Sequence, residues 1–129
     1  MSTILLCLLV TALIPYGLAF WGSAVRRKEF GEVDNHHPRQ QYAKMTGRGA
    51  RLWAAQQNAW EALGLFTAAV VAVGLTGTTG AMVVLASVIF VLARIAHALC
   101  YAFDLATPRS IIFIVAFLAV LFLFAAAIF

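Results

Sequence analysis

Polar side chains follow one face of each of two apolar segments in this 129-residue sequence. In the first segment they are separated by steps of seven and three residues, and in the second by steps of three and four. These spacings keep side chains on one side of a helix. Ionisable groups in apolar helices are costly in a bilayer and therefore indicate a functional site. The two sets are Arg51, Asn58 and Glu61 in the first segment, and Arg94, His97 and Tyr101 in the second.

The depth of these residues predicts which of them meet. If the two segments cross a membrane in opposite directions, Glu61 lies about 10 Å and Arg94 about 9 Å inside the same boundary. We therefore expect a Glu61–Arg94 ion pair within the membrane. Asn58 and His97 are matched in depth in the same way.

A structural ion pair that only locks two helices is the simpler interpretation, and one pair would be enough for it. Two further arginines, Arg51 and Arg109, belong to the same region of the sequence. A guanidinium group can bind a carboxylate through two parallel hydrogen bonds. The combined set therefore predicts a pocket for an anionic ligand.

The adjacent histidines His36 and His37, near Asp34, raise the question of a metal site. Adjacent positions lack the i, i+4 spacing that places two ligands on one helical face. No thiolate or second carboxylate completes a ligand set. We therefore predict no metal.

The composition requires a membrane around these segments. Hydrophobic residues make up 64% of the chain and charged residues only 11%, against about 25% charged in a soluble domain. A transmembrane helix needs about 20 apolar residues, and the glycine- and threonine-rich residues 74–80 divide a stretch too long for one span. The sequence predicts an all-α bundle of four transmembrane helices at residues 4–23, 50–75, 81–103 and 109–129.

The distribution of charge predicts the orientation. Seven of the nine Lys and Arg residues lie between Arg26 and Arg51, in and beside the expected connector, residues 24–49. The positive-inside rule places this connector in the cytoplasm and both termini outside. A basic connector between two apolar helices is a topology signal, and we expect no nucleic-acid partner.

Two stretches resemble the MAPEG family, the membrane-associated proteins in eicosanoid and glutathione metabolism. Residues 51–61 (RLWAAQQNAWE) are similar to the family's second-helix pattern of Arg followed by Asn-x-x-Glu. Residues 94–101 (RIAHALCY) and 108–110 (PRS) are similar to its third helix and the start of its fourth. The connector residues 34–39 (DNHHPR) resemble a bacterial subgroup, which implies a multi-pass protein of the bacterial inner membrane.

The resemblance implies a homotrimer that binds glutathione as co-substrate between neighbouring subunits, near the cytoplasmic face. It implies that Arg109 lies near the glutathione sulfur, and Tyr101 can donate a hydrogen bond to the thiolate or to the tripeptide. The other expected partner is a hydrophobic small-molecule acceptor from the bilayer. Residue matching implies glutathione contacts at Asn58, Glu61, Arg94, His97 and Tyr101, and Arg51 belongs to the same motif.

The sequence departs from the family pattern at two places. Gly64 stands where many relatives have proline, and the turn before Arg109 is short, with Ala106 where some relatives have a basic residue. Eicosanoid-specific chemistry is therefore not expected. We predict a glutathione transferase or peroxidase that acts on hydrophobic electrophiles. The alternatives are a proton-coupled transporter that uses Glu61, and a family member that binds ligand without catalysis.

Overall fold

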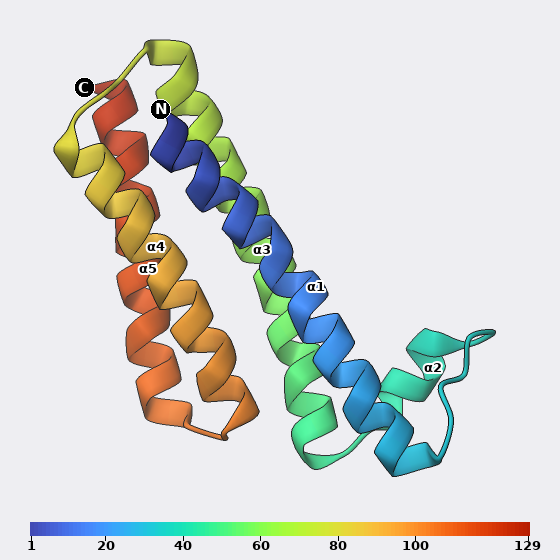
Figure 1. The fold of residues 1–129 in the computed structure, drawn as a ribbon. Coiled ribbons are helices and arrows are strands. Elements are labelled where there is room, and N and C mark those ends of the chain that lie inside the picture. Colours follow the sequence, from blue (N-terminus) through green and yellow to red (C-terminus); the bar gives the residue numbers. More distant parts are fainter.

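The computed structural model describes all residues from 1 to 129 and contains five helices and no strand (Figure 1). Four of them are long and apolar enough to cross a membrane. The shortest of the four has 22 residues and is about 33 Å long at 1.5 Å per residue, so it spans a hydrocarbon core of about 30 Å. The predicted all-α, four-span fold is confirmed. The helices are α1 (Ser2–Phe30), α2 (Pro38–Ala43), α3 (Gly47–Thr76), α4 (Ala81–Ala102) and α5 (Ala106–Ile128).

The helices extend beyond the apolar segments at several ends. α1 continues past the expected residue 23 to Phe30, because basic residues can continue a helix outside the bilayer. Gly31 ends it with a left-handed φ of 81°, and its N–H donates to the Arg27 carbonyl. α3 ends in the same way at Gly77, whose φ is 67°, within the predicted glycine- and threonine-rich turn. A residue without Cβ adopts this conformation at little cost.

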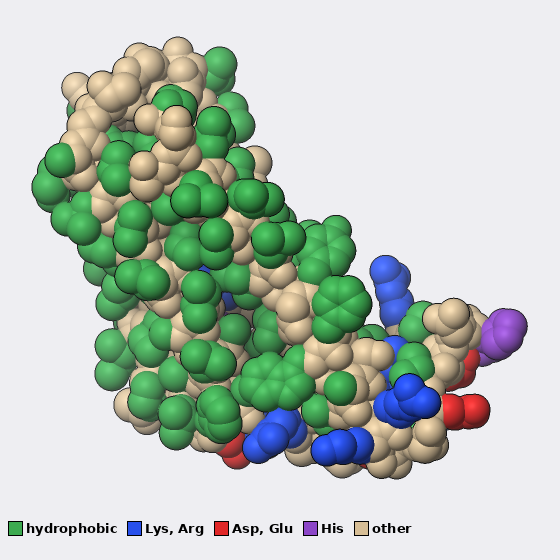
Figure 2. Space-filling model, in the orientation of Figure 1, with side chains coloured by type: hydrophobic (Ala, Val, Ile, Leu, Met, Phe, Trp, Pro, Cys, Tyr) green, Lys and Arg blue, Asp and Glu red, His purple; other side chains and the backbone are tan.

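The bundle consists of two antiparallel helix pairs, α1 with α3 and α4 with α5 (Figure 1). Both chain termini and the α3–α4 turn lie at one end, which we call the termini end. The opposite end holds α2 and the α4–α5 turn, and we call it the connector end. Lys and Arg side chains gather at the connector end, whereas hydrophobic side chains cover most of the visible flank of the bundle (Figure 2).

The apolar interior has two parts. Near the termini end, the rings of Phe66 on α3 and Phe90 on α4 stack at 4.3 Å between centroids, within a cluster of 15 buried residues. The smaller cluster, toward the connector end, contains mainly small side chains, so the helices approach closely there. Its members are Leu18, Leu52, Ala55, Ala59, Ala98 and Ala102.

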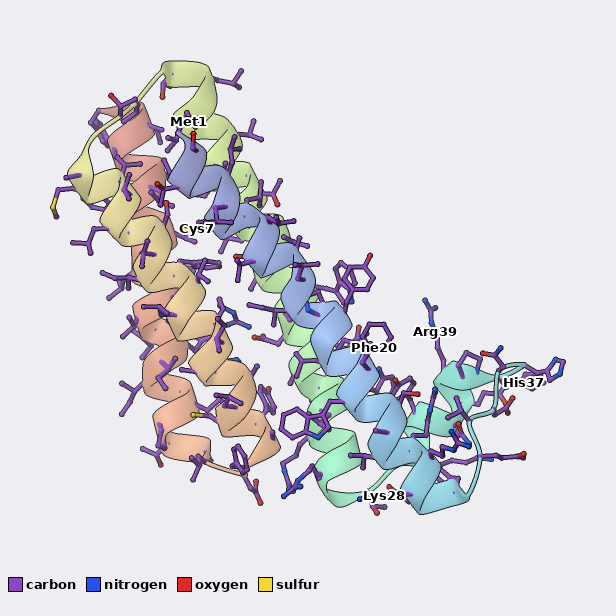
Figure 3. All side chains as sticks on the ribbon, in the orientation of Figure 1. Met1, Cys7, Phe20, Lys28, His37 and Arg39 are labelled. Carbon is purple, nitrogen blue, oxygen red and sulfur yellow. The ribbon has the colours of Figure 1, made fainter.

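The connector packs against the bundle through a buried arginine. Arg26 lies with its guanidinium carbon 4.2 Å from the ring centroid of Tyr42, and its Nη1 donates to the carbonyl of Pro38 at 3.4 Å. The side chains of His37 and Arg39 point away from the bundle (Figure 3). Figure 3 also places Cys7 near the termini end of α1. Both cysteines are free thiols.

Candidate functional site

A chain of hydrogen bonds joins α4 to α3 at the predicted site. The side chain of Arg94 is buried, with only 3% of its surface exposed. Its Nη2 donates to Oδ1 of Asn58 at 2.6 Å and approaches the Asn58 carbonyl at 3.3 Å. Asn58 Nδ2 donates in turn to Oε2 of Glu61 at 3.2 Å. Asn58 thus links the guanidinium to the carboxylate.

The predicted direct ion pair between Glu61 and Arg94 is wrong. The chain has two ion pairs, and neither residue takes part in them. The rise of 1.5 Å per residue places Glu61 and Arg94 at similar depths in the membrane. It does not determine in which direction each side chain points around its helix axis. Asn58, one turn nearer the connector end, presents both its amide oxygen and its carbonyl to Arg94. The Glu61 side chain stays exposed on α3.

The second part of the site is built on α4 and the start of α5. The guanidinium carbon of Arg109 lies 4.5 Å from the centroid of the Tyr101 ring. The ring of His97 meets the same tyrosine edge to face at 5.2 Å. His97 is buried, and its Nδ1 makes no hydrogen bond within the chain. The three side chains form one stacked group at the connector end of α4.

A polar cavity of about 350 Å³ opens beside this stacked group. A second, more apolar cavity of about 170 Å³ adjoins the Arg94 network, and Asn58 and Phe113 line both cavities. An anion can bind in the polar cavity while an apolar group lies alongside it. The polar cavity is lined by Asn58, His97, Tyr101, Arg109, Ser110, Phe113 and Ile114. The apolar cavity is lined by Asn58, Glu61, Ala62, Leu65, Phe90, Arg94, Phe113, Ala116 and Phe117.

Arg51 does not line either cavity. Its Nε donates to the backbone carbonyl of Tyr101 at 3.1 Å, and its Nη1 lies 3.5 Å from Oδ2 of Asp104. The structure therefore brings the other predicted site residues together around two adjoining cavities and ties Arg51 to the turn between α4 and α5.

Two residues at the site were not singled out by the sequence. Asp104 forms an ion pair with Arg51. Its position three residues after Tyr101 was the feature of the sequence that could have placed it beside the site. Phe113 lines both cavities, and its spacing of four from Arg109 places both residues on one face of α5.

The histidine-containing connector is organised by a carboxylate. Asp34 Oδ1 accepts the backbone N–H groups of His36 and His37 at 2.8 and 2.9 Å. The hydrogen bond from His37, with a further contribution from His36, lowers the pKa of the exposed Asp34 carboxyl. Throughout the chain, no three His, Cys, Asp or Glu side chains gather in a way that would hold a metal ion.

A comparison with protein families accounts for nearly the whole chain. A family model described as the MAPEG family matches residues 4–129. No curated protein and no solved structure gives a match. The matched residues include both cavities, the whole of α3, α4 and α5, and α1 from its third residue onward.

Proposed function

Because the chain belongs to the MAPEG family, we propose that it is an integral membrane enzyme that binds glutathione. In this proposal it acts as a transferase or peroxidase on hydrophobic electrophiles from the bilayer. The observation that carries the proposal is the cavity in which Arg109 lies over Tyr101 beside Asn58, the residue that holds Arg94. This cavity provides positive charge at membrane depth next to an apolar compartment.

The charges of the site suit glutathione, which carries two carboxylates and one ammonium group. Arg94 makes hydrogen bonds to Asn58 only and forms no ion pair with a carboxylate of the chain. Its positive charge is available to a ligand carboxylate. Glu61 is exposed and outside any ion pair, so it can receive the ammonium group. His97 Nδ1 offers a further hydrogen-bonding position.

Arg109 is the group that we propose to act on the sulfur. The chemistry needs a thiolate, and a free cysteine-type thiol has a pKa of about 8.5. A guanidinium near the sulfur favours the charged form, and each unit by which the thiol pKa falls corresponds to about 1.4 kcal/mol. Arg109 lies in the first turns of α5, where the helix dipole adds to the positive potential. Tyr101, held against Arg109, can donate a hydrogen bond to the same sulfur.

We further propose that the chain works as a homotrimer with its connector end in the cytoplasm. The exposed Glu61 on α3 supports a site completed by a neighbouring subunit. The gathering of Lys and Arg at the connector end (Figure 2) supports the orientation. Both termini then face outside, since they lie together at the opposite end.

Proton-coupled transport is the competing function from another class. The absence of a direct Glu61–Arg94 ion pair favours it, because an unpaired membrane carboxylate can exchange a proton. Arg94 and Arg109, which line the adjoining cavities, oppose it because they repel a cationic substrate. A family member that binds glutathione without catalysis is the other alternative.

An activity assay on purified protein in detergent tests the proposal. The protein is mixed with glutathione and either chlorodinitrobenzene or an organic hydroperoxide, and formation of conjugate or of oxidised glutathione is followed. We expect a rate above the uncatalysed one that falls in Arg109→Ala and stays normal in Arg39→Gln, an exposed connector variant. Folded protein that binds glutathione with neither activity would support the non-catalytic alternative. Proton-coupled uptake of a cation by proteoliposomes, lost in Glu61→Gln, would support the transporter.

A further inference from the structure

The carbonyl of Tyr101 is held from two directions at the end of α4. It accepts the Arg51 side-chain Nε–H at 3.1 Å and the backbone N–H of Asp104 at 3.2 Å. Arg51 comes from α3, and its Nη1 also lies 3.5 Å from the Asp104 carboxylate. One arginine thus contacts both the last turn of α4 and the turn that follows it.

The conformation of that turn depends on Asp104. Its φ of 62° is the only positive φ of a residue other than glycine, and aspartate tolerates this region better than most residues. Directly after it, the N–H of Leu105 returns to the carbonyl of Cys100 at 2.9 Å. The next residue, Ala106, begins α5, and Arg109 is the fourth residue of that helix. The turn therefore fixes the direction from which Arg109 approaches Tyr101.

The apolar contacts between α3 and α4 at this end bring the two helices close together. They involve mainly alanine side chains, including Ala55 and Ala59 on α3 and Ala98 and Ala102 on α4. Small side chains allow the two backbones to approach closely. The Arg51 contact adds to this packing a polar link between α3 and the α4–α5 turn.

We propose that Arg51 and Asp104 form a clamp that positions Tyr101 and Arg109 for the bound thiol, so that Arg51 is a positioning residue rather than a ligand-binding one. This inference rests on the proposed glutathione chemistry. The direct alternative, suggested by the sequence, is that Arg51 contacts glutathione itself.

The two roles of Arg51 predict different kinetic effects. A clamp that acts through Arg109 predicts that Arg51→Gln lowers kcat by about tenfold, the scale of a lost hydrogen bond from a charged donor, with glutathione affinity near its wild-type value. Asp104→Asn, which keeps a residue suited to positive φ, should lower kcat by about fivefold at most, since the exposed ion pair is weak. Direct binding predicts lost affinity instead.

A double variant shows whether the effect passes through Arg109. The apparent pKa of the bound thiol, read from thiolate absorbance, should rise in Arg51→Gln. In an Arg109→Ala background, Arg51→Gln should cause no further change in that pKa or in turnover. A purely structural role would instead lower the yield of folded protein without this dependence. Arg51→Lys should recover part of kcat because it keeps a donor, and Arg39→Gln serves as the charge-matched control.

The thiol of Cys100 gives a measurement that needs no glutathione. It is 7% exposed, and its carbonyl forms part of the turn. In a Cys7→Ser background, maleimide should label Cys100 several-fold faster in Arg51→Gln than in the parent. If the wild type binds no glutathione, the proposed function fails, and the labelling rate alone decides the clamp. Unchanged labelling together with unchanged kcat, or loss of affinity with kcat retained, would overturn the clamp.

Discussion

Nη2 of Arg94 on α4 donates to Oδ1 of Asn58 on α3 at 2.6 Å. This hydrogen bond joins the two helix pairs at membrane depth, and it gives a partner to the guanidinium of Arg94, a residue of which 3% of the surface is exposed. A second bond, from the Asn58 amide to Glu61 at 3.2 Å, extends the network toward the outer face of α3.

Removal of the Asn58 side chain should destabilise the protein more than its size suggests. Asn58→Ala leaves the buried Arg94 with only the weaker contact to the Asn58 carbonyl, and loss of a hydrogen bond to a charged group costs about 1.5–3 kcal/mol. Thermal unfolding in detergent checks this, with Gln57→Ala, an exposed neighbour, as the control. In double-mutant cycles, Arg94 should couple more strongly to Asn58 than to Glu61. Stronger coupling of Arg94 to Glu61 than to Asn58 would instead support a direct ion pair between Arg94 and Glu61.

Arg109→Ala should lower turnover more than it lowers glutathione affinity. Removal of one group that stabilises charge in the reaction typically reduces kcat by about 10²-fold, and equal loss of kcat and kcat/KM identifies such a group. The apparent thiol pKa should rise toward its solution value. Arg109→Lys keeps the charge but loses the planar guanidinium, so its activity should be intermediate. Unchanged turnover and an unchanged thiol pKa in Arg109→Ala would contradict the proposal that Arg109 stabilises the thiolate.

Topology can be tested without reference to function. Reporter fusions at Phe129 and within the connector at Lys44 should report opposite sides of the membrane, with Lys44 in the cytoplasm. The C-terminus and α2, which Lys44 follows directly, lie at opposite ends of the bundle (Figure 1). Two cytoplasmic readings would contradict the proposed orientation and the four-span arrangement together.

The connector turn around Asp34 should depend on pH. Backbone N–H groups of His37 and His36 lower the pKa of the folded carboxyl below its ordinary value of 3.8. The stabilisation is therefore fully present above 3.8 and is lost as the pH falls through the lower folded value. Hydrogen exchange at the His36 and His37 amides should speed up in acid, beyond the intrinsic pH dependence. Asp34→Asn should show fast exchange at neutral pH and little further change. The same pH dependence of exchange in the wild type and in Asp34→Asn would contradict the role of the Asp34 carboxylate in this turn.

The helices were predictable because hydropathy and helix length are local properties. The long uncharged stretches and the glycine-rich turn gave four spans, and the structure contains four helices of that kind. Axial rise also matched Glu61 with Arg94 and Asn58 with His97 in depth, since depth depends only on residue number.

Side-chain direction and turn conformation were not predictable in this way. The choice of Asn58 rather than Glu61 as the Arg94 partner depends on rotation about two helix axes. The contact between Arg51 and Asp104 depends on the positive φ of Asp104, which sequence spacing does not encode. The structure shows Arg51 in contact with the α4–α5 turn, and its predicted contact with glutathione stays a prediction.

Equilibrium binding of glutathione to the purified full-length protein in detergent tests the central claim most directly. Titration calorimetry should show saturable binding to the wild type that weakens with added salt, because charged groups draw the tripeptide into the cavity. Arg94→Ala should bind about tenfold more weakly or worse, the scale of a lost charge-assisted hydrogen bond, whereas Arg39→Gln should bind like the wild type. No saturable binding to folded wild-type protein, or equal affinity in Arg94→Ala and Arg39→Gln, would contradict the glutathione site proposed at Arg94.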